Sequence, residues 1–373
     1  MNQPKDVAIV NRKVRDIRLD ILRIFALFCV IAFHFFLNSG FYDKIVIGKQ
    51  MYIMCIIRSF FTVCVPLFII LTGYLLNRKI LSKQYYKRII KILIIYFICS
   101  VIYSLFAKYY LKEEMNLYIF LKKLLGYNGT RYAWYIEMYI GLFLIIPFLN
   151  IVINNLKNQK SFQLLLVTII VLMGLPSVLN CFDFKVLPDW WMGTYPIFYY
   201  FLGAYLSRYP LKLNTKLNII LLIIFTIFDG SFNFYKSYGK NYIWESWNGY
   251  SSIFVMIESL LAFNLILKIR FKAENNMRDK FFKTLSDACL GAYLLSCAFD
   301  SIYYDKLSLL VPEVKDRFIY APIVVLLSFT SSLLISIIIN IFYKFFANMF
   351  INLKNIIYIR RKEDNENNCA CIK

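Results

Sequence analysis

Residues 19–38 read LDILRIFALFCVIAFHFFLN, a run of apolar side chains that contains four polar ones. The polar residues are Asp20, Arg23, His34 and Asn38. At about 100° per residue, the step from Arg23 to His34 makes three helical turns plus roughly 20°, so both side chains face one side. Ionisable groups are costly in contact with lipid. We therefore expect a membrane-spanning helix whose polar stripe faces the interior of a helical bundle.

The whole chain shares the apolar character of this run. Of its 373 residues, 60% are hydrophobic and 17% are charged, whereas soluble domains have about 45–50% apolar and about 25% charged residues. The apolar residues fall in long blocks, which indicates a multi-pass membrane protein. The aromatic content of 18% excludes a disordered chain. A nucleic-acid-binding protein is also excluded, because the basic residues lie in short clusters between the apolar blocks.

Ten segments are candidates for membrane spans, since a helix needs about 20 residues to cross a bilayer. They lie at 19–38, 51–76, 88–107, 132–153, 162–179, 194–207, 217–234, 249–267, 285–303 and 317–346. The sixth is the shortest and contains Pro196. Between the third and fourth spans, residues 117–125 have the pattern of an amphipathic helix on the membrane surface. The predicted fold class is all-α, a polytopic bundle of about ten transmembrane helices.

The basic residues give the orientation. The chain has 43 Lys and Arg against 22 Asp and Glu, a net charge of +21. With ten spans both termini lie on one side, and that side carries 29 of the 43 basic residues. The positive-inside rule predicts that both termini are cytoplasmic, and contact with anionic lipid of the cell membrane is expected. The chain then divides into a cytoplasmic N-terminal segment (1–18), a ten-span membrane domain (19–346) and a cytoplasmic basic tail (347–373).

The sequence does not favour a metal site. The nine cysteines include no CxxC pair, and the chain has one histidine. Structural zinc sites use four Cys or His ligands. We expect no metal and no permanently bound cofactor, and most cysteines should act as small apolar side chains.

His34 is the leading candidate for chemistry. A neutral imidazole can take a proton from a hydroxyl group and return it near pH 7, as a general base does. The alternative is a buried histidine that only hydrogen-bonds to its neighbours. Four acidic residues lie within the spans, namely Glu137, Glu258, Asp229 and Asp300. Of these, Glu137 or Glu258 is expected to orient His34, or to pair with Arg58 of the second span.

A basic cluster begins the third span. Arg88 and Lys91 are three residues apart, so they share a helix face. Such clusters commonly serve topology and reach along the helix to the membrane surface. The functional alternative is a cytoplasmic anion pocket for phosphates, in which arginine is the bidentate partner.

The outer loops are rich in aromatic residues, among them Trp190, Trp191, Trp244 and Trp247. Aromatic belts at membrane interfaces account for such residues. A second interpretation is a sugar-binding platform, because aromatic faces suit the apolar side of pyranose rings. The sequence leaves both interpretations open.

Several segments together resemble the membrane acyltransferase family 3. That family carries an Arg, ten residues and then a His on its first span, which is the spacing of Arg23 and His34. Residues 65–76, VPLFIILTGYLL, are similar to the family's PLFFxxSGYLL stretch, with Thr72 in place of Ser. Later segments are also similar, and the resemblance covers essentially the whole chain.

Three positions depart from the family pattern. Arg88 matches the first Arg of the family's Arg-x-x-Arg motif, but Lys91 stands for the second and lacks the guanidinium fork. Tyr132 and Ser296 stand where many relatives have His. The histidine chemistry that the resemblance implies therefore rests on His34.

The resemblance implies an integral membrane O-acyltransferase, in the first place an O-acetyltransferase. Its donor would be cytoplasmic acyl-CoA (acetyl-CoA), with Arg23, Arg88 and Lys91 near the CoA phosphates. Its acceptor would be a hydroxyl of a cell-surface or lipid-linked carbohydrate. His34 would act as general base, oriented by Glu137 or Glu258, in direct transfer or through an acyl-His relay.

Two other classes fit the same composition. A transporter or flippase of a glycan or small molecule would also combine many spans, a polar stripe and outer aromatics, although the chain shows no internal repeat. An inactive receptor or scaffold is the third class.

Overall fold

The computed structural model describes residues 15–182, 184–271 and 276–370, and these ranges form helices with no named strand. The helices are α1 (Ile17–Asn38), α2 (Gly48–Phe61), α3 (Cys64–Leu76), α4 (Lys83–Tyr86), α5 (Ile89–Tyr109), α6 (Leu117–Leu125), α7 (Trp134–Asn155), α8 (Gln159–Ile169), α9 (Pro176–Leu179), α10 (Tyr195–Arg208), α11 (Thr215–Ser237), α12 (Ile253–Leu267), α13 (Asn276–Leu310), α14 (Val314–Arg317) and α15 (Ala321–Ala370). Within the described ranges, nine helical segments are long and apolar enough to cross a membrane. The predicted all-α, multi-pass bundle is confirmed.

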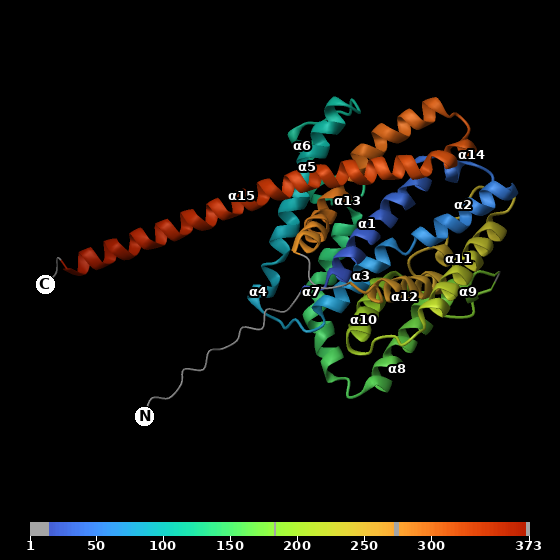
Figure 1. Cartoon of the computed structure of the whole chain (residues 1–373), viewed down its shortest axis with the longest axis horizontal. Helices are drawn as coiled ribbons and strands as arrows, with labels where there is room; N and C mark the ends of the chain where they lie inside the picture. The colour runs from blue at the N-terminus through green and yellow to red at the C-terminus, as the bar shows by residue number, and fades with distance from the viewer. Residues whose placement is uncertain (1–14, 183, 272–275, 371–373) are drawn as a thin grey trace.

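The first span is the centre of the bundle. α1 packs against α3, α13, α12, α2 and α15, and Figure 1 shows it surrounded by these helices. From Leu22 to Phe36 most of its side chains are buried, including His34. The polar stripe of α1 therefore faces protein, as its helical periodicity predicts.

The second predicted span is two helices rather than one. α2 ends at Phe61 and α3 begins at Cys64. Pro66 lies in the first turn of α3, where it has no N–H to donate to the carbonyl four residues before it, so a continuous helix is disfavoured. The break follows from this proline, and it places the buried Arg58 at the end of α2.

The sixth predicted span is α10, which has 14 residues. It is about 21 Å long, short of the ~30 Å hydrocarbon core. It nevertheless passes through the bundle. At its first residue the Tyr195 ring packs on Tyr250, which stacks on Trp134 at the start of α7, and at its last residue Arg208 binds the Ile153 carbonyl near the end of α7. In the described part of the chain, nine long passes and this short one make ten.

α10 crosses α3 at very short range because each helix has a glycine at the contact. A Cβ atom on Gly73 would lie 2.0 Å from the carbonyl oxygen of Tyr200, and one on Gly203 would lie 1.9 Å from that of Ile70. Close approach through small residues is how membrane helices pack tightly. Gly73 belongs to the motif segment 65–76, so this motif has a packing role.

Other predicted features have separate outcomes. The surface helix predicted at 117–125 is confirmed as α6, and none of its residues is buried. α13 and α15 are longer than predicted, and α15 extends far past the bundle over part of the predicted tail (Figure 1). Residues 1–14 of the predicted N-terminal segment lie outside the described residues.

Candidate active site

One end of the α1 stripe is anchored by Arg23. Its Nη1 donates a hydrogen bond to the Ser286 hydroxyl of α13 and lies 3.7 Å from a carboxylate oxygen of Asp20. Asp20 is itself bound by Arg15 through two hydrogen bonds of 2.7 and 2.6 Å. These contacts fix the Arg23 guanidinium between α1 and α13. We call this part of the molecule the basic end.

A polar cavity of about 830 Å³ opens at the basic end. Four cationic side chains line it, namely Arg15, Arg23, Arg78 and Lys79. Arg15 is paired with Asp20, whereas the side chains of Arg78 and Lys79 have no ion-pair partner among the described residues. These two cations are therefore available for an anionic ligand.

Three carboxylates also line the polar cavity, namely Asp16, Asp20 and Asp287, and each has a basic partner: Arg18, Arg15 and Lys344, respectively. Burial tends to raise the pKa of Asp16, but the hydrogen bonds and charge of Arg18 outweigh this effect, and the pKa is lowered from its ordinary value. The ionised Asp16 is held by Arg18 at 2.7 Å. Its charge is thus matched by a residue outside the cavity lining.

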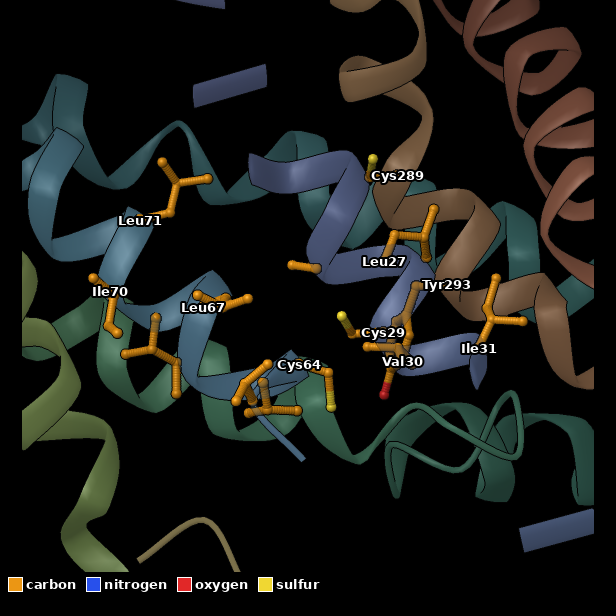
Figure 2. Close-up of a cluster of buried hydrophobic side chains, with 14 of the residues drawn as sticks. Leu27, Cys29, Val30, Ile31, Cys64, Leu67, Ile70, Leu71, Cys289 and Tyr293 are labelled. Carbon is orange, nitrogen blue, oxygen red and sulfur yellow. The ribbon is translucent and has the colours of Figure 1, made fainter. Parts of the chain in front are cut away.

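A narrower apolar cavity of about 270 Å³ begins where the polar one ends. Both cavities are lined by Arg23 and Leu75, so they adjoin. The apolar cavity follows α1 as far as Val30, with Leu71 of α3 and Cys289 and Tyr293 of α13 around it. Figure 2 shows where labelled side chains of α1, α3 and α13 lie in this region, among them Val30, Leu71, Cys289 and Tyr293.

His34 lies one helical turn beyond Val30 and is 6% exposed. Its Nδ1 is 3.5 Å from Oδ2 of Asp300, a fully buried residue of α13. Tyr132 stacks on the imidazole at a centroid distance of 3.7 Å and donates a 3.0 Å hydrogen bond to the same Asp300 oxygen. Ser328 of α15 donates to the other oxygen at 2.6 Å. Segments from four parts of the chain therefore meet at one histidine–carboxylate pair.

The far side of His34 is closed by Asn38. Its side-chain amide donates to the His34 carbonyl at 2.8 Å and to the Tyr132 hydroxyl at 3.0 Å, and its oxygen accepts from Arg131 at 3.2 Å. Tyr132, which departs from the family pattern, thus takes part in the site through its ring and its hydroxyl. All four polar residues of the α1 stripe have contacts that a lipid-facing helix could not make.

The structure brings neither predicted glutamate to His34. Within the described part of the chain, Asp300 is the carboxylate within 4 Å of the imidazole. Glu137 lies in the first turn of α7 and is exposed, because Ile136 occupies the inward face of that turn. Glu258 is fully buried, but the charges that act on it are those of Asp229 and Arg58. Neither glutamate is therefore placed to orient His34 as predicted, and the carboxylate beside the imidazole is that of Asp300.

Arg88 and Lys91 line neither cavity and are exposed. They lie in and next to the first turn of α5, ahead of Ile95, where the helix first becomes buried. Ile92 is the α5 residue that reaches the apolar cavity. Besides Arg15 and Arg23, the cations that line the polar cavity are Arg78 and Lys79, which directly follow α3.

Three residues of the site were missed or ranked too low from the sequence. Asp300 is among the four acids within spans, and it follows Tyr293 by seven residues, so the two share a helix face. That shared face was a usable signal, because Tyr293 lies in residues 291–296, one of the later segments that are similar to the family. Arg78 and Lys79 could have been found as the first cations after the Gly73 motif.

A comparison with protein families matches residues 16–341 to the acyltransferase family 3 model, described as an acyltransferase domain. No curated protein and no solved structure matches the chain. The match covers α1 to the greater part of the membrane-crossing length of α15, and with it both cavities and the histidine–carboxylate pair. The chain therefore belongs to acyltransferase family 3 and is a multi-pass membrane acyltransferase.

Proposed function

We propose that this protein transfers an acyl group, most simply acetyl, from cytoplasmic acyl-CoA to a hydroxyl of an extracytoplasmic carbohydrate. One observation carries the proposal: Arg23 lines both cavities, and the same face of α1 leads from it to the His34–Asp300 pair. Acyl-CoA carries phosphates at one end and a narrow pantetheine arm at the other, which matches a polar cavity that leads into a narrower apolar one. The basic end is then the cytoplasmic end.

The polar cavity would bind the phosphates of CoA. Arg78 and Lys79 supply unpaired cations there, and Arg23 supplies a planar guanidinium that can bind a phosphate through two hydrogen bonds. The apolar cavity would take the pantetheine arm, with Thr72, Tyr135 and Tyr139 as the polar groups along its wall. The adenine end would stay in the wide, open part.

His34 would act as the general base at the far end. It takes the proton of the acceptor hydroxyl while the oxygen attacks the thioester carbon, so that the C–S bond breaks and a C–O ester bond forms. The proton then passes to the CoA sulfur, and the products are the ester and free CoA. Asp300 beside Nδ1 stabilises the imidazolium that forms in between.

A short barrier separates the cavity from His34. The lining of the cavity stops at Val30, which is about 6 Å along the helix axis from His34. Tyr135 and Tyr293 occupy this region, and the Tyr293 hydroxyl is tied to the Tyr132 carbonyl. A rotation of one of these rings would let the thioester reach the imidazole.

Donor binding can be tested with the variant Leu75→Cys, because Leu75 lines both cavities and is 44% exposed. The purified variant is treated with N-ethylmaleimide, and modification of the introduced thiol is followed by peptide mass spectrometry. Acetyl-CoA should slow the modification in Leu75→Cys and in its combination with Lys91→Ala, but not in its combination with Arg23→Ala. Equal rates with and without acetyl-CoA in Leu75→Cys would contradict a CoA site in this cavity.

Turnover is tested with membranes that contain the protein and acetyl-CoA labelled in the acetyl group. Label should appear in membrane-associated glycan and free CoA thiol should be released, and both signals should be lost in His34→Ala. Undiminished transfer by His34→Ala would exclude the proposed base. Movement of glycan across the membrane without thiol release would favour a transporter.

A further inference from the structure

A second buried polar cluster lies away from His34, where α2, α11 and α12 meet. It contains Arg58 of α2, Asp229 and Asn233 of α11, and Glu258 of α12, and each of these side chains is 0% exposed. α11 packs on both α2 and α12, and α11 and α12 lie side by side in Figure 1. None of these residues lines the two cavities of the proposed acyl-transfer site. The acyl-transfer mechanism therefore leaves the cluster unused.

Oxygen atoms of the cluster have lone pairs that no neighbour uses. Among the described residues, Oδ2 of Asp229, both carboxylate oxygens of Glu258, Oδ1 of Asn233 and the hydroxyl of Thr226 have no hydrogen-bond partner. Thr226 is one turn from Asp229 on α11 and its hydroxyl is close to Glu258. Unsatisfied polar groups are costly inside a membrane protein, and native structures satisfy them with a bound species.

Arg58 does not neutralise these carboxylates directly. Its Nε donates to the Tyr42 hydroxyl at 3.2 Å and its Nη1 to the Asn248 carbonyl at 3.2 Å, whereas its Nη2 has no hydrogen-bond partner among the described residues. Its guanidinium also stacks on three aromatic rings, of which Trp244 is nearest at 4.6 Å. In the described part of the chain no ion pair within 4 Å joins Arg58 to Asp229 or Glu258. Asp229 receives a hydrogen bond from Asn233 at 3.1 Å and has the Ser59 hydroxyl beside it, and Glu258 has the Thr226 hydroxyl beside it.

The charges of the cluster do not balance if both carboxylates are ionised. They would then carry two negative charges against the one positive charge of Arg58. The other titratable groups that face them are Tyr199 of α10 and Tyr242 of the segment before α12, and neither contributes a cation. A net charge buried in the membrane is strongly unfavourable. One further positive charge is therefore needed beside Asp229 and Glu258.

We propose that Asp229, Glu258 and Thr226 bind one monovalent cation, with Na⁺ as the best candidate, between α11 and α12. Carboxylate and hydroxyl oxygens are hard ligands that suit such an ion, and those of Asp229, Glu258 and Thr226 have free lone pairs. The ion would supply the missing charge and hold α11 against α12. A proton shared within the cluster is the competing way to supply this charge, and the experiment below separates the two.

The test uses the full-length protein in detergent, in NaCl or in choline chloride at equal ionic strength. The midpoint of thermal unfolding should rise with NaCl and level off, and ²²Na⁺ should bind saturably with one ion per chain. Asp229→Asn and Glu258→Gln should each abolish both effects. Glu114→Gln, an exposed acid of the loop before α6, should keep both effects.

The ²²Na⁺ binding measurement on the wild type can refute the proposal even if a variant folds poorly. Equal unfolding midpoints in the two salts, with no saturable ²²Na⁺ binding, would overturn it. A midpoint that rises on acidification in choline chloride and gains nothing from Na⁺ would assign the site to a proton instead. Neither test depends on acyl transfer, so failure of the proposed function would leave this inference standing.

Discussion

His34 depends on residues that other helices supply. Asp300 from α13 lies beside Nδ1, Tyr132 covers the ring, and Ser328 from α15 completes the coordination of the carboxylate. A histidine that only fills space would not need a fully buried carboxylate beside it. The arrangement resembles the way a buried acid holds a catalytic imidazole in one orientation and stabilises its protonated form.

Replacing Asp300 with Asn tests this arrangement. The amide can still accept the hydrogen bond from Tyr132, but it cannot stabilise an imidazolium. We expect kcat for thiol release from acetyl-CoA to fall by about 10²–10⁴-fold, with KM for acetyl-CoA nearly unchanged. Asp305→Asn, an exposed acid of the same helix, is the matched control. A rate near wild type for Asp300→Asn would remove the carboxylate from the mechanism.

The proposed CoA site predicts that two pairs of basic residues differ in their effect on KM for acetyl-CoA. Arg78 and Lys79 line the polar cavity, whereas Arg88 and Lys91 are exposed and do not. Alanine at Arg78 or Lys79 should raise KM for acetyl-CoA by about tenfold, the loss expected for one charge-assisted hydrogen bond. Alanine at Arg88 or Lys91 should change KM by less than about twofold. The reverse ranking, from steady-state kinetics, would return the phosphate site to the start of α5.

At the scale of helices, the contact between α3 and α10 positions one wall of the apolar cavity. α3 supplies Phe68, Leu71, Thr72 and Leu75 to that wall. The two glycines let the backbones touch, and the side-chain amide of Asn77 joins α3 to Ser207 of α10 at 2.9 Å. A wider separation would move the whole inward face of α3.

Gly73→Ala should therefore harm both stability and donor binding. Its methyl group would overlap the Tyr200 carbonyl, which is backbone and cannot rotate away. We expect a loss of about 2–3 kcal/mol, seen as a lower thermal unfolding midpoint. Gly141→Ala is the control, because a Cβ at Gly141 would meet nothing within 4 Å. Equal midpoints for the two variants would show that the α3–α10 contact tolerates the added volume.

At the scale of the whole molecule, the short α10 makes the number of membrane passes even. With ten passes, α1 begins and the last span ends on the side of the polar cavity, where the proposed cytoplasmic donor would reach Arg23 directly. Nine passes would put the termini on opposite sides and the basic residues on both. The proposed direction of acyl transfer thus depends on a helix too short to be recognised as a span by length.

Surface labelling of intact cells can check this orientation. Lys185→Cys, in the loop before α10, should react with a membrane-impermeant maleimide. Lys212→Cys, in the loop after α10, should react only after the cells are opened. The seven natural cysteines from Cys29 to Cys297 are buried, and replacing Cys369 and Cys371 with serine in both variants removes the remaining two from the background. Labelling of both variants in intact cells would contradict the predicted topology.

Much of the fold could be predicted because it depends on local properties. Segment length and hydropathy identified the membrane helices and α6, and the 3.6-residue repeat placed Arg23 and His34 on one inward face. The boundaries of α13 and α15 differed, because helices continue past the bilayer where polar residues still favour helix. The break before α3 was readable in principle from Pro66, since a proline acts on its own helix.

The sequence by itself determined a basic, ten-pass helical bundle with one histidine on a buried polar stripe. The tertiary structure decided which acid stands beside that histidine, which cations border the donor cavity, and that Arg58, Asp229 and Glu258 form a separate cluster. The physical reason is the distance along the chain over which each effect acts. Periodicity fixes the directions of side chains on one helix, but the partner of His34 comes from α13, far along the chain. Only the packing of whole helices, set by contacts such as Gly73 on α10, brings such residues together.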